Sequence, residues 1–348
     1  MVLRGLLSAV ICALSVAAVT PAGDGVGPQV GEKIPEFSLP DAFGRAHTFS
    51  SLAGPKGATI VFFRSADWCP PCKAHLIELQ GHLERLRRDG LSVFAISYDS
   101  PAILAEFAKR HAITFPLLSD AGSVVIKRFG VLDAHAWEGT ARYGVPYRGT
   151  IVVNRDGVVT STVFQKTWNE HVTMASVLLG LGKGVDVPAT KITAPRLAIT
   201  SFTSDRAVMP GAHFTIVLDL RPESRIHIYA PGASQYLPVK LTINPRPGLI
   251  VKNAQFPASE DYFFKPLDEH VPVYQRPFRI TQEVMIDPSP EAQKALSSVK
   301  SISIDGTLDY QACSDKDCFP PQRVPLSWTV NVGRLDDTRI VISGPPSS

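Results

Sequence analysis

The sequence predicts an α/β domain followed by an all-β sandwich. The chain has 348 residues, which exceeds the usual size of one domain and favours two domains of roughly 130 to 160 residues each. Apolar strand-like runs alternate with helix-like segments over residues 26–182, whereas residues 196–333 contain many short stretches of alternating apolar and polar residues. The first pattern is typical of a mixed sheet covered by helices on both faces, and the second of a β-sandwich.

The first domain is expected to begin with a strand, a helix and a second strand. Residues 59–63 form a short apolar run, as expected for a strand that is buried on both faces. Apolar residues then recur at helical spacing over residues 72–86, and Asp89 followed by glycine supplies a stop signal. Residues 91–98 form another apolar run, which predicts the next strand.

The second half of this domain is expected to contain a helix, a hairpin and a final helix. Ser100 followed by proline is typical of a helix start, and this helix is expected to run to about residue 110. Residues 150–153 and 158–164 flank the turn Asn-Arg-Asp-Gly and predict a hairpin. A helix over about residues 169–181 should complete the domain.

A linker, the sandwich and a tail should follow. Residues 183–195 contain proline and glycine without a useful period and are predicted to be the linker. A helical patch interrupts the sandwich near residues 290–297, and the polar tail over residues 334–348 is expected to be disordered. The stretches with the clearest alternation are residues 213–220, 301–312 and 326–332.

The N-terminus predicts export. A short basic start, an apolar run over residues 5–19 and an exit rich in small residues are the layout of a signal peptide, which we place at residues 1–22. A membrane anchor is the alternative, although the run is short for a span of about 20 residues. We therefore expect a periplasmic or otherwise exported protein.

The net charge of the chain is only +3 and no basic block occurs, which excludes nucleic acid as an implied partner.

Four of the five cysteines form two close pairs, while the fifth lies in the predicted leader. Cys69 pairs in sequence with Cys72, and Cys313 with Cys318. Disulfides that close such short loops remove little entropy from the unfolded chain, so structural stapling is a weak reason for them. An oxidising compartment would allow both pairs to close. Their spacing therefore favours redox centres.

The first pair lies between a predicted strand and a predicted helix. Cys69 should therefore sit at a helix N-terminus, where backbone N–H groups and the helix dipole stabilise a thiolate. Cys72 follows one turn later and could resolve a mixed disulfide, and Trp68 offers an apolar surface beside the exposed sulfur. A structural disulfide and half of a zinc site are the alternatives, but no second ligand pair of the usual kind lies in this domain.

Other polar residues on the same predicted helix carry weaker signals. Glu78 could act as a proton acceptor at the base of the cysteine pair, or it could pair on the surface with Lys73 or His82. His75 and His82 are expected to lie on a solvated face and not to bind a metal. The sequence contains no glycine-rich phosphate loop or nucleophilic-serine elbow. We therefore predict no metal and no small-molecule cofactor.

Residues 64–73, together with residues 148–157, resemble the thioredoxin-like redoxin group that includes the AhpC/TSA peroxiredoxins. The resemblance covers about residues 26–181 and implies a thioredoxin-like fold. It places Arg148 where thioredoxins carry a proline facing the cysteines and where peroxiredoxins carry an arginine that stabilises the peroxide and the thiolate. Arg148 could equally be a satisfied surface arginine.

The sequence departs from the peroxiredoxin pattern ahead of the first cysteine. Phe62 and Ala66 stand where that family carries a proline and a threonine or serine. The hydroxyl that would position a peroxide is therefore missing, which favours dithiol exchange over peroxide reduction. A thiol peroxidase with Cys69 as the peroxidatic and Cys72 as the resolving cysteine remains the alternative.

The second pair lies at the end of a predicted strand. Cys313 and Cys318 are separated by four residues, and a disulfide can close there if the α-carbons come within about 7 Å. Residues 310–321, with residues 225–232 and 261–265, resemble the N-terminal domain of the thiol:disulfide interchange protein DsbD over about residues 195–332.

This second resemblance implies an immunoglobulin-like sandwich that receives electrons from a thioredoxin-like domain and passes them to periplasmic thiol proteins. It also implies that Phe263 or a neighbouring aromatic residue caps the cysteines. The family separates its cysteines by five residues, whereas this chain has four between them. A structural disulfide in a domain that only binds partners is therefore the alternative for this pair.

Together these features predict an exported thiol:disulfide oxidoreductase. Cys69, Cys72, Cys313 and Cys318 are its predicted catalytic residues, supported by Trp68, Arg148, Glu78 and Phe263. The expected partners are periplasmic thiol and disulfide proteins, with a membrane thiol reductase of the DsbD kind as the electron donor.

Overall fold

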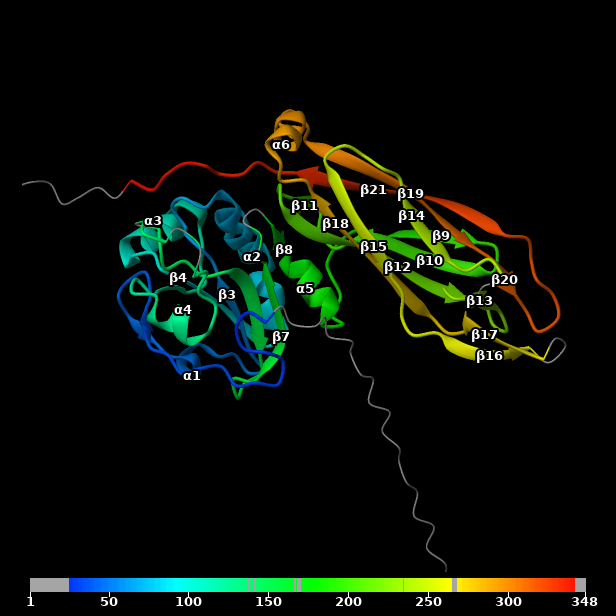
Figure 1. The fold of residues 1–348 in the computed structure, drawn as a ribbon, viewed down its shortest axis with the longest axis horizontal. Coiled ribbons are helices and arrows are strands. Elements are labelled where there is room, and N and C mark those ends of the chain that lie inside the picture. Colours follow the sequence, from blue (N-terminus) through cyan, green and yellow to red (C-terminus); the bar gives the residue numbers. More distant parts are fainter. Residues whose placement is uncertain are drawn as a thin grey trace, which may run out of the picture.

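The computed structural model describes residues 25–341, apart from residues 135, 137, 141, 166, 168–169, 234 and 265–267. The predicted signal peptide and residues 342–348 of the predicted tail lie outside the described residues. An α/β domain and an elongated β domain lie beside each other (Figure 1), as the sequence predicted. Within the described part of the chain, no helix has the length and apolar character needed to cross a bilayer.

The first domain is built on a mixed sheet in the strand order β5-β4-β3-β6-β7. The central strand β3 (Gly57–Phe62) is buried along its whole length. It pairs in parallel with β4 (Leu91–Ser97) and antiparallel with β6 (Arg148–Val153). The outer strands are β5 (Leu117–Ser119) and β7 (Val159–Gln165). Strands β3, β4, β6 and β7 match the predicted apolar runs and hairpin closely, whereas β5 was not predicted.

Helices cover both faces of this sheet. Leucines of α2 (Pro70–Arg88), with side chains of α3 (Pro101–His111) and α5 (Met174–Gly180), pack on one face. Helix α4 (Val124–Arg128) packs on the other face. The remaining short elements are β1 (Leu39–Pro40), β2 (Ala46–His47) and α1 (Phe49–Leu52).

Two predicted boundaries differ from the structure. Helix α5 begins at Met174 because the Thr173 side chain caps it by accepting a hydrogen bond from the Ser176 backbone N–H. Residues 190–194, expected in the linker, form strand β9 (Thr190–Ala194), which pairs with β10 (Leu197–Thr203). The prolines at 188 and 195 flank this strand and interrupt none of its ladder.

The second domain is a sandwich whose core lies between two main sheets. Apolar side chains alternate inward along β12 and β19, and Tyr310 and Trp328 are buried among them. The first sheet contains, with β9 and β10, strands β12 (Ala212–Pro222), β18 (Phe278–Ile286) and β15 (Leu249–Gln255). The second contains β11 (Ala207–Val208), β21 (Gln322–Val332), β19 (Ser301–Tyr310) and β14 (Lys240–Ile243).

A small third sheet forms the end of the sandwich that lies away from the first domain (Figure 1). It contains β16 (Glu260–Phe264), β17 (Glu269–Tyr274), β13 (His227–Tyr229) and β20 (Ala312–Cys313). The predicted helical patch is α6 (Pro290–Leu296), at the opposite end of the sandwich.

The two domains are joined by backbone pairing and by buried polar groups. Strand β8 (His171–Val172), from the first domain, pairs in parallel with β12 of the sandwich. His213 on β12 contacts Glu170 and Glu283 through its two ring nitrogens at 3.1 and 2.8 Å. The Asp205 carboxylate accepts a hydrogen bond from the Thr173 hydroxyl at 2.8 Å. These contacts fix the first domain on one end of the sandwich.

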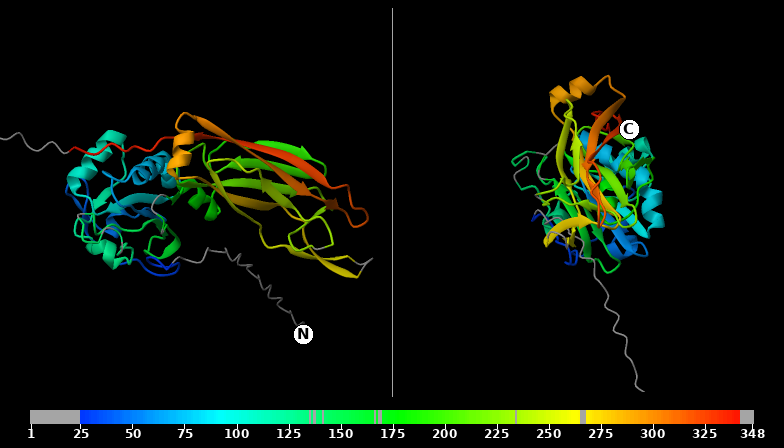
Figure 2. Two further views of the ribbon diagram at one scale, coloured as in Figure 1. Left: turned by 45° about the horizontal axis from the view of Figure 1, so that its top comes forward. Right: turned by 90° about the vertical axis from the view of Figure 1, so that its right-hand side faces the viewer.

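The start of the predicted disordered tail is placed against the first domain. Beyond β21 the chain runs in an extended conformation past helices α2 and α3 (Figures 1 and 2). Asp67 and Lys73, which flank the first cysteine pair, bind this segment through Arg339 and the Thr338 carbonyl. The expectation of disorder is therefore wrong for residues 335–340, because charged partners on another domain hold them.

We expect the junction between the domains to weaken as the pH rises through neutrality. Burial, and then the charge of Glu78, raise the pKa of Asp205 to about 7. A carboxyl group whose folded pKa lies above its unfolded value stabilises the fold at low pH, and this stability is lost as the pH rises through the folded pKa. Asp205→Asn should therefore reduce the fall in melting temperature between pH 5 and pH 8, which calorimetry would measure.

The control for this test is Asp305→Asn, which changes an exposed aspartate of β19. Each kcal/mol should appear as about 2–4 °C in a chain of this size class. An Asp205→Asn variant that keeps the wild-type pH dependence would contradict the prediction.

Candidate active site

Cys69 and Cys72 form a disulfide at the N-terminus of α2. Cys69 is the N-cap residue, and its carbonyl accepts the first helical hydrogen bonds, from the N–H groups of Cys72 at 3.0 Å and Lys73 at 3.1 Å. Cys72 is fully buried, whereas Cys69 keeps 4% of its surface exposed. When the pair is reduced, the helix N-terminus would stabilise a thiolate at Cys69. The structure thus places the pair where the sequence predicted.

The loop before Cys69 is held by a buried carboxylate that sequence reasoning missed. Asp99 accepts hydrogen bonds from the Ala66 backbone N–H at 2.7 Å, the Ser65 hydroxyl at 2.8 Å and the Ser97 hydroxyl at 3.0 Å. Burial raises the pKa of Asp99 to about 6. Ala66 is fully buried in this loop, so the position that carries a hydroxyl in peroxiredoxins is tied to Asp99 through its backbone alone.

Trp68 lies beside the cysteine pair, as predicted, and is held on two sides. Its indole N–H donates to the Tyr98 hydroxyl at 2.8 Å. The Arg142 guanidinium lies 4.8 Å from the centre of its ring, a cation–π contact. The side chain also packs against the core cluster that contains both cysteines. Trp68 is therefore positioned as a wall of the site.

Arg148 is buried, which excludes the alternative of a satisfied surface arginine. It begins β6, next to Gly149, which pairs with Phe62 at the carboxyl end of β3. It is 1% exposed and donates a hydrogen bond to the Glu170 carbonyl. Among the described residues, its Nε and Nη1 atoms have no hydrogen-bond partner. Burial and the positive charge of Arg64 lower the pKa of Arg148 to about 9.

Arg64 is a second buried guanidinium at this edge of the sheet. It is fully buried two residues beyond β3. Burial lowers its pKa to about 10, while Asp133 opposes the shift. Two buried cations near the carboxyl end of β3, from which the chain continues to Cys69, make this edge electropositive. Such a setting favours an anion, whether a thiolate or an anionic substrate.

The expectation of a solvated His75 is wrong. The ring stacks on His171 at a centroid distance of 5.2 Å, and both histidines are buried. Burial lowers the pKa of each ring, which favours the neutral form of both histidines. The cause is β8, which carries His171 onto this side of α2 and which local sequence patterns did not predict.

Glu78 is engaged at the domain junction. Its carboxylate accepts a hydrogen bond from the Met174 backbone N–H at 2.9 Å and pairs with His82 at 3.4 Å. This supports the predicted alternative of pairing with His82. Glu78, His82 and Asp205 also form a group whose ligand atoms all lie within 4.8 Å of one another, the arrangement in the described chain that could accept a metal ion.

Cys313 and Cys318 form the second disulfide. Their α-carbons lie 4.1 Å apart, within the limit used above. Cys313 on β20 is fully buried and pairs with His227 of β13. The Tyr229 hydroxyl lies 3.5 Å from the Cys318 sulfur.

The predicted cap residue Phe263 does not lie over this disulfide. Its side chain is 42% exposed and packs on His270, 4.9 Å between ring centres. The neighbouring Tyr262 instead reaches the loop between the cysteines, because its hydroxyl donates to Asp315 at 3.0 Å. Its ring also lies 4.5 Å from that of His227. Alternation along β16 explains the difference, since adjacent side chains point to opposite faces.

The structure does not bring the two cysteine pairs together. Cys69 and Cys72 lie at the start of α2, whereas β20 lies at the far end of the sandwich (Figure 1). The backbone pairing of β8 with β12 holds the first domain at the other end of the sandwich.

Comparisons with known proteins identify both domains. Residues 30–162 match the model of the AhpC/TSA family. Peroxiredoxin Bcp of Escherichia coli (strain K12) is 30% identical over 145 residues, which are 41% of this chain and 90% of that protein. The chain belongs to the AhpC/TSA family. A putative peroxiredoxin of Mycobacterium tuberculosis is 33% identical over 142 residues, 41% of this chain and 88% of that protein.

A solved structure and a second family model complete the comparison. The crystal structure of peroxidoxin BcpB from Mycobacterium tuberculosis has 26% identity and a TM-score of 0.36, and the match covers 40% of this chain and 88% of that one. Residues 200–326 match the model of the thiol:disulfide interchange protein DsbD, N-terminal. The chain is therefore a thiol-based oxidoreductase that fuses an AhpC/TSA domain to a DsbD N-terminal domain, as the two resemblances predicted.

We expect Arg148→Met to lower the reactivity of reduced Cys69. Removing a buried cation from this edge of the sheet should raise the thiol pKa by about one unit, which lowers the thiolate fraction about tenfold at neutral pH. The melting temperature should stay the same or rise, because the buried guanidinium is incompletely paired. Alkylation rates as a function of pH would measure the thiol pKa.

The matched control is Arg155→Met, which removes an exposed arginine from the turn between β6 and β7. An unchanged alkylation profile in Arg148→Met would show that Arg148 does not act on the cysteine.

Proposed function

We propose that this protein is an exported thiol:disulfide oxidoreductase that exchanges electrons with protein dithiols and disulfides. The observation that supports the proposal is the position of both cysteines at the N-terminus of α2, where Cys69 is the N-cap residue with 4% of its surface exposed and Cys72 is fully buried. A thiolate at a helix N-terminus that is followed by a shielded resolving thiol is suited to forming a mixed disulfide and then releasing it.

The reaction proceeds in two exchanges. The Cys69 thiolate attacks one sulfur of a partner disulfide and forms a mixed disulfide, and the other partner sulfur leaves as a thiolate that takes up a proton. Cys72 loses its proton and attacks the Cys69 sulfur, which releases the second partner thiol and forms the Cys69–Cys72 disulfide. Two electrons pass to the partner. A dithiol donor then reduces the Cys69–Cys72 disulfide, and we propose a membrane thiol reductase as this donor.

The direction of net transfer depends on reduction potentials. A difference of about 30 mV between two dithiol couples corresponds to roughly 1.4 kcal/mol and biases the exchange about tenfold. Arg64 and Arg148 would stabilise the thiolate at Cys69, and this favours the reduced form of the pair.

We propose that Cys313 and Cys318 serve a partner protein or a second copy of the chain. Transfer from Cys69 of the same chain would require the pairing of β8 with β12 to break. Pro70, next to Cys69, shares a pocket with Pro210 and Leu296 at the near end of the sandwich, whereas β20 lies at its far end.

The Tyr262 hydroxyl binds Asp315 and the Tyr229 hydroxyl lies 3.5 Å from the Cys318 sulfur, so both tyrosines hold the loop that closes this disulfide. Cys318 is exposed and is the residue that a docking partner could reach.

A thiol peroxidase is the second candidate function. The identity with peroxiredoxins and the buried Arg148, whose Nε and Nη1 atoms have no hydrogen-bond partner in the described chain, favour it. Ala66, which stands where peroxiredoxins carry a hydroxyl, opposes it. In this reaction Cys69 would be oxidised to a sulfenic acid, and Cys72 would then close the disulfide with loss of water.

We expect Cys72→Ser to accumulate mixed disulfides with partner proteins in the exported compartment, because the second exchange is blocked. Cys69→Ser should form none, since the attacking sulfur is absent. Non-reducing electrophoresis followed by mass spectrometry of the trapped species would measure both. Fast hydrogen peroxide turnover with a dithiol donor, abolished by Cys69→Ser, together with an absence of trapped proteins, would overturn dithiol exchange in favour of the peroxidase.

A second test addresses the role of the sandwich disulfide. We expect Tyr262→Ala to speed the reduction of Cys313–Cys318 by dithiothreitol about tenfold or more, because the hydrogen bond that holds the loop between the cysteines through Asp315 is removed. Phe263→Ala is the matched control, since Phe263 lies on the opposite face of β16. If replacing both cysteines by serine lowers the melting temperature but leaves partner trapping and electron transfer unchanged, the disulfide is structural.

A further inference from the structure

Residues 335–340, which we call the C-terminal strap, lie across the first turn of α2. The strap leaves β21 of the sandwich and passes the active-site end of the first domain (Figures 1 and 2). Ile340, like Trp68, packs against the core cluster that contains Cys69 and Cys72. An extended piece of chain therefore already lies beside the cysteine pair.

The strap is recognised through an arginine and its backbone. The guanidinium of Arg339 forms a two-pronged interaction with the Asp67 carboxylate, with its Nε 2.9 Å from both oxygens. The backbone N–H of Ile340 donates to the same carboxylate at 2.6 Å. These bonds lower the pKa of Asp67 against the effect of its burial. Asp67 is two residues from Cys69, so the strap binds in the immediate surroundings of this cysteine.

Basic residues recognise the acidic end of the strap. Lys73, only 1% exposed, donates to the Thr338 carbonyl and lies 3.8 Å from Asp336. His111 at the end of α3 lies 3.3 Å from the same carboxylate. Acidic and basic side chains of the first domain thus face an arginine and an aspartate that are three residues apart in the strap.

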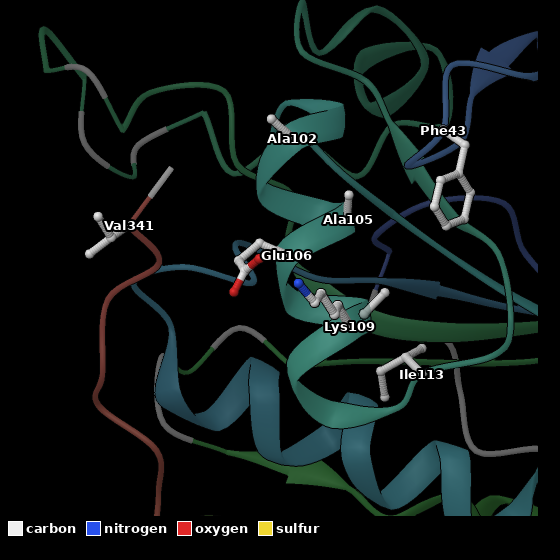
Figure 3. Close-up of a pocket in the computed structure, with 8 residues that line it drawn as sticks. Phe43, Ala102, Ala105, Glu106, Lys109, Ile113 and Val341 are labelled. Carbon is white, nitrogen blue, oxygen red and sulfur yellow. The ribbon is translucent and has the colours of Figure 1, made fainter. Parts of the chain in front are cut away.

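The surface that binds the strap continues beyond it. A pocket of about 880 Å³ extends over the exposed side of α3, with Val341 at one edge and Phe43 at the other (Figure 3). Val341 and Phe43 are 76% and 72% exposed. The pocket offers apolar side chains and the charges of Glu106 and Lys109 to a chain longer than the strap.

We propose that the strap occupies the docking groove for the protein substrate, an extended segment of a thiol protein that carries an acidic residue three positions before an arginine. The proposal rests on the proposed function and names its substrate class. The strap acts as an internal competitor, because the partner segment needs Asp67 and Lys73, which the strap holds. Displacement is feasible because a partner segment with the same charge pattern would replace the contacts that Arg339 makes with Asp67, and the Arg339 side chain is 60% exposed.

The test uses the full-length protein with both disulfides closed. A fluorescent peptide of the sequence Arg-Leu-Asp-Asp-Thr-Arg-Ile-Val, which corresponds to residues 334–341, is titrated with wild type and with Arg339→Glu, and anisotropy is measured. Charge reversal at Arg339 repels the strap from Asp67, so the variant should bind the peptide at least tenfold more tightly than wild type. A peptide with alanine in place of its second arginine should bind the variant at least tenfold more weakly.

The matched control is Arg334→Glu, the same substitution five residues earlier. Arg334 contacts the Ser297 carbonyl of the sandwich and not α2, so this variant should bind like wild type. Ile340→Asp should also release the strap, because it places a charge where Ile340 packs against the core cluster. This variant should bind the peptide as tightly as Arg339→Glu, so the test remains decisive if one of the two variants folds poorly.

Two outcomes would overturn the proposal. Either the peptide binds neither released variant, or it binds both released variants and wild type equally. Because binding is measured without turnover, the result is independent of the trapping experiment. Trapped partners without peptide binding would reject the groove and keep the oxidoreductase, whereas peptide binding without trapped partners would reject the proposed chemistry alone.

Discussion

The burial of one face of helix α2 against the central sheet is the constraint on which the other features depend. Leu76, Leu79 and Leu86 are fully buried on this face, and full burial of each leucine contributes about 1.5–3 kcal/mol. This packing sets the direction of the helix N-terminus and thereby places Cys69 at the edge where β3 ends. It also presents Lys73 to the strap and Glu78 to the sandwich. One helix therefore connects the redox site, the groove and the domain junction.

The buried charges around this helix are costly for stability and useful for chemistry. Burial lowers the pKa of Arg64 and of Arg148, which reflects the cost of placing two cations in a low-dielectric region. The same reasoning applies to Asp99, whose raised pKa accompanies its role in holding the loop before the cysteine. Buried groups with shifted pKa values therefore lie in the same part of the domain as the first cysteine pair.

Periodicity and motif spacing predicted much of the architecture. The strands β3 and β4, the helix α3 with its Ser100 cap, and the hairpin β6–β7 follow from apolar runs, capping residues and turn residues that act over a few neighbours. Strand β8 escaped prediction because its pairing partner, β12, lies in another domain. Strand β9 was predicted to be part of the linker because of the prolines and glycines around it, although its partner β10 follows directly in the chain.

Phe263 was the first candidate to cap the second disulfide, whereas the neighbouring Tyr262 reaches its loop. The two residues are adjacent on β16, and a shift of one residue along a strand moves a side chain to the opposite face.

The two domains, the two cysteine pairs and the location of Cys69 at a helix N-terminus could be read from the sequence alone, because they depend on local periodicity and spacing. Three further features depend on tertiary packing: Arg148 is buried near Arg64, His75 stacks on His171, and the sandwich separates the two disulfides. Tertiary packing also decided that the polar tail binds beside the active site. Each of these features joins residues far apart in the chain, whose contacts depend on packing between elements and not on neighbours in sequence.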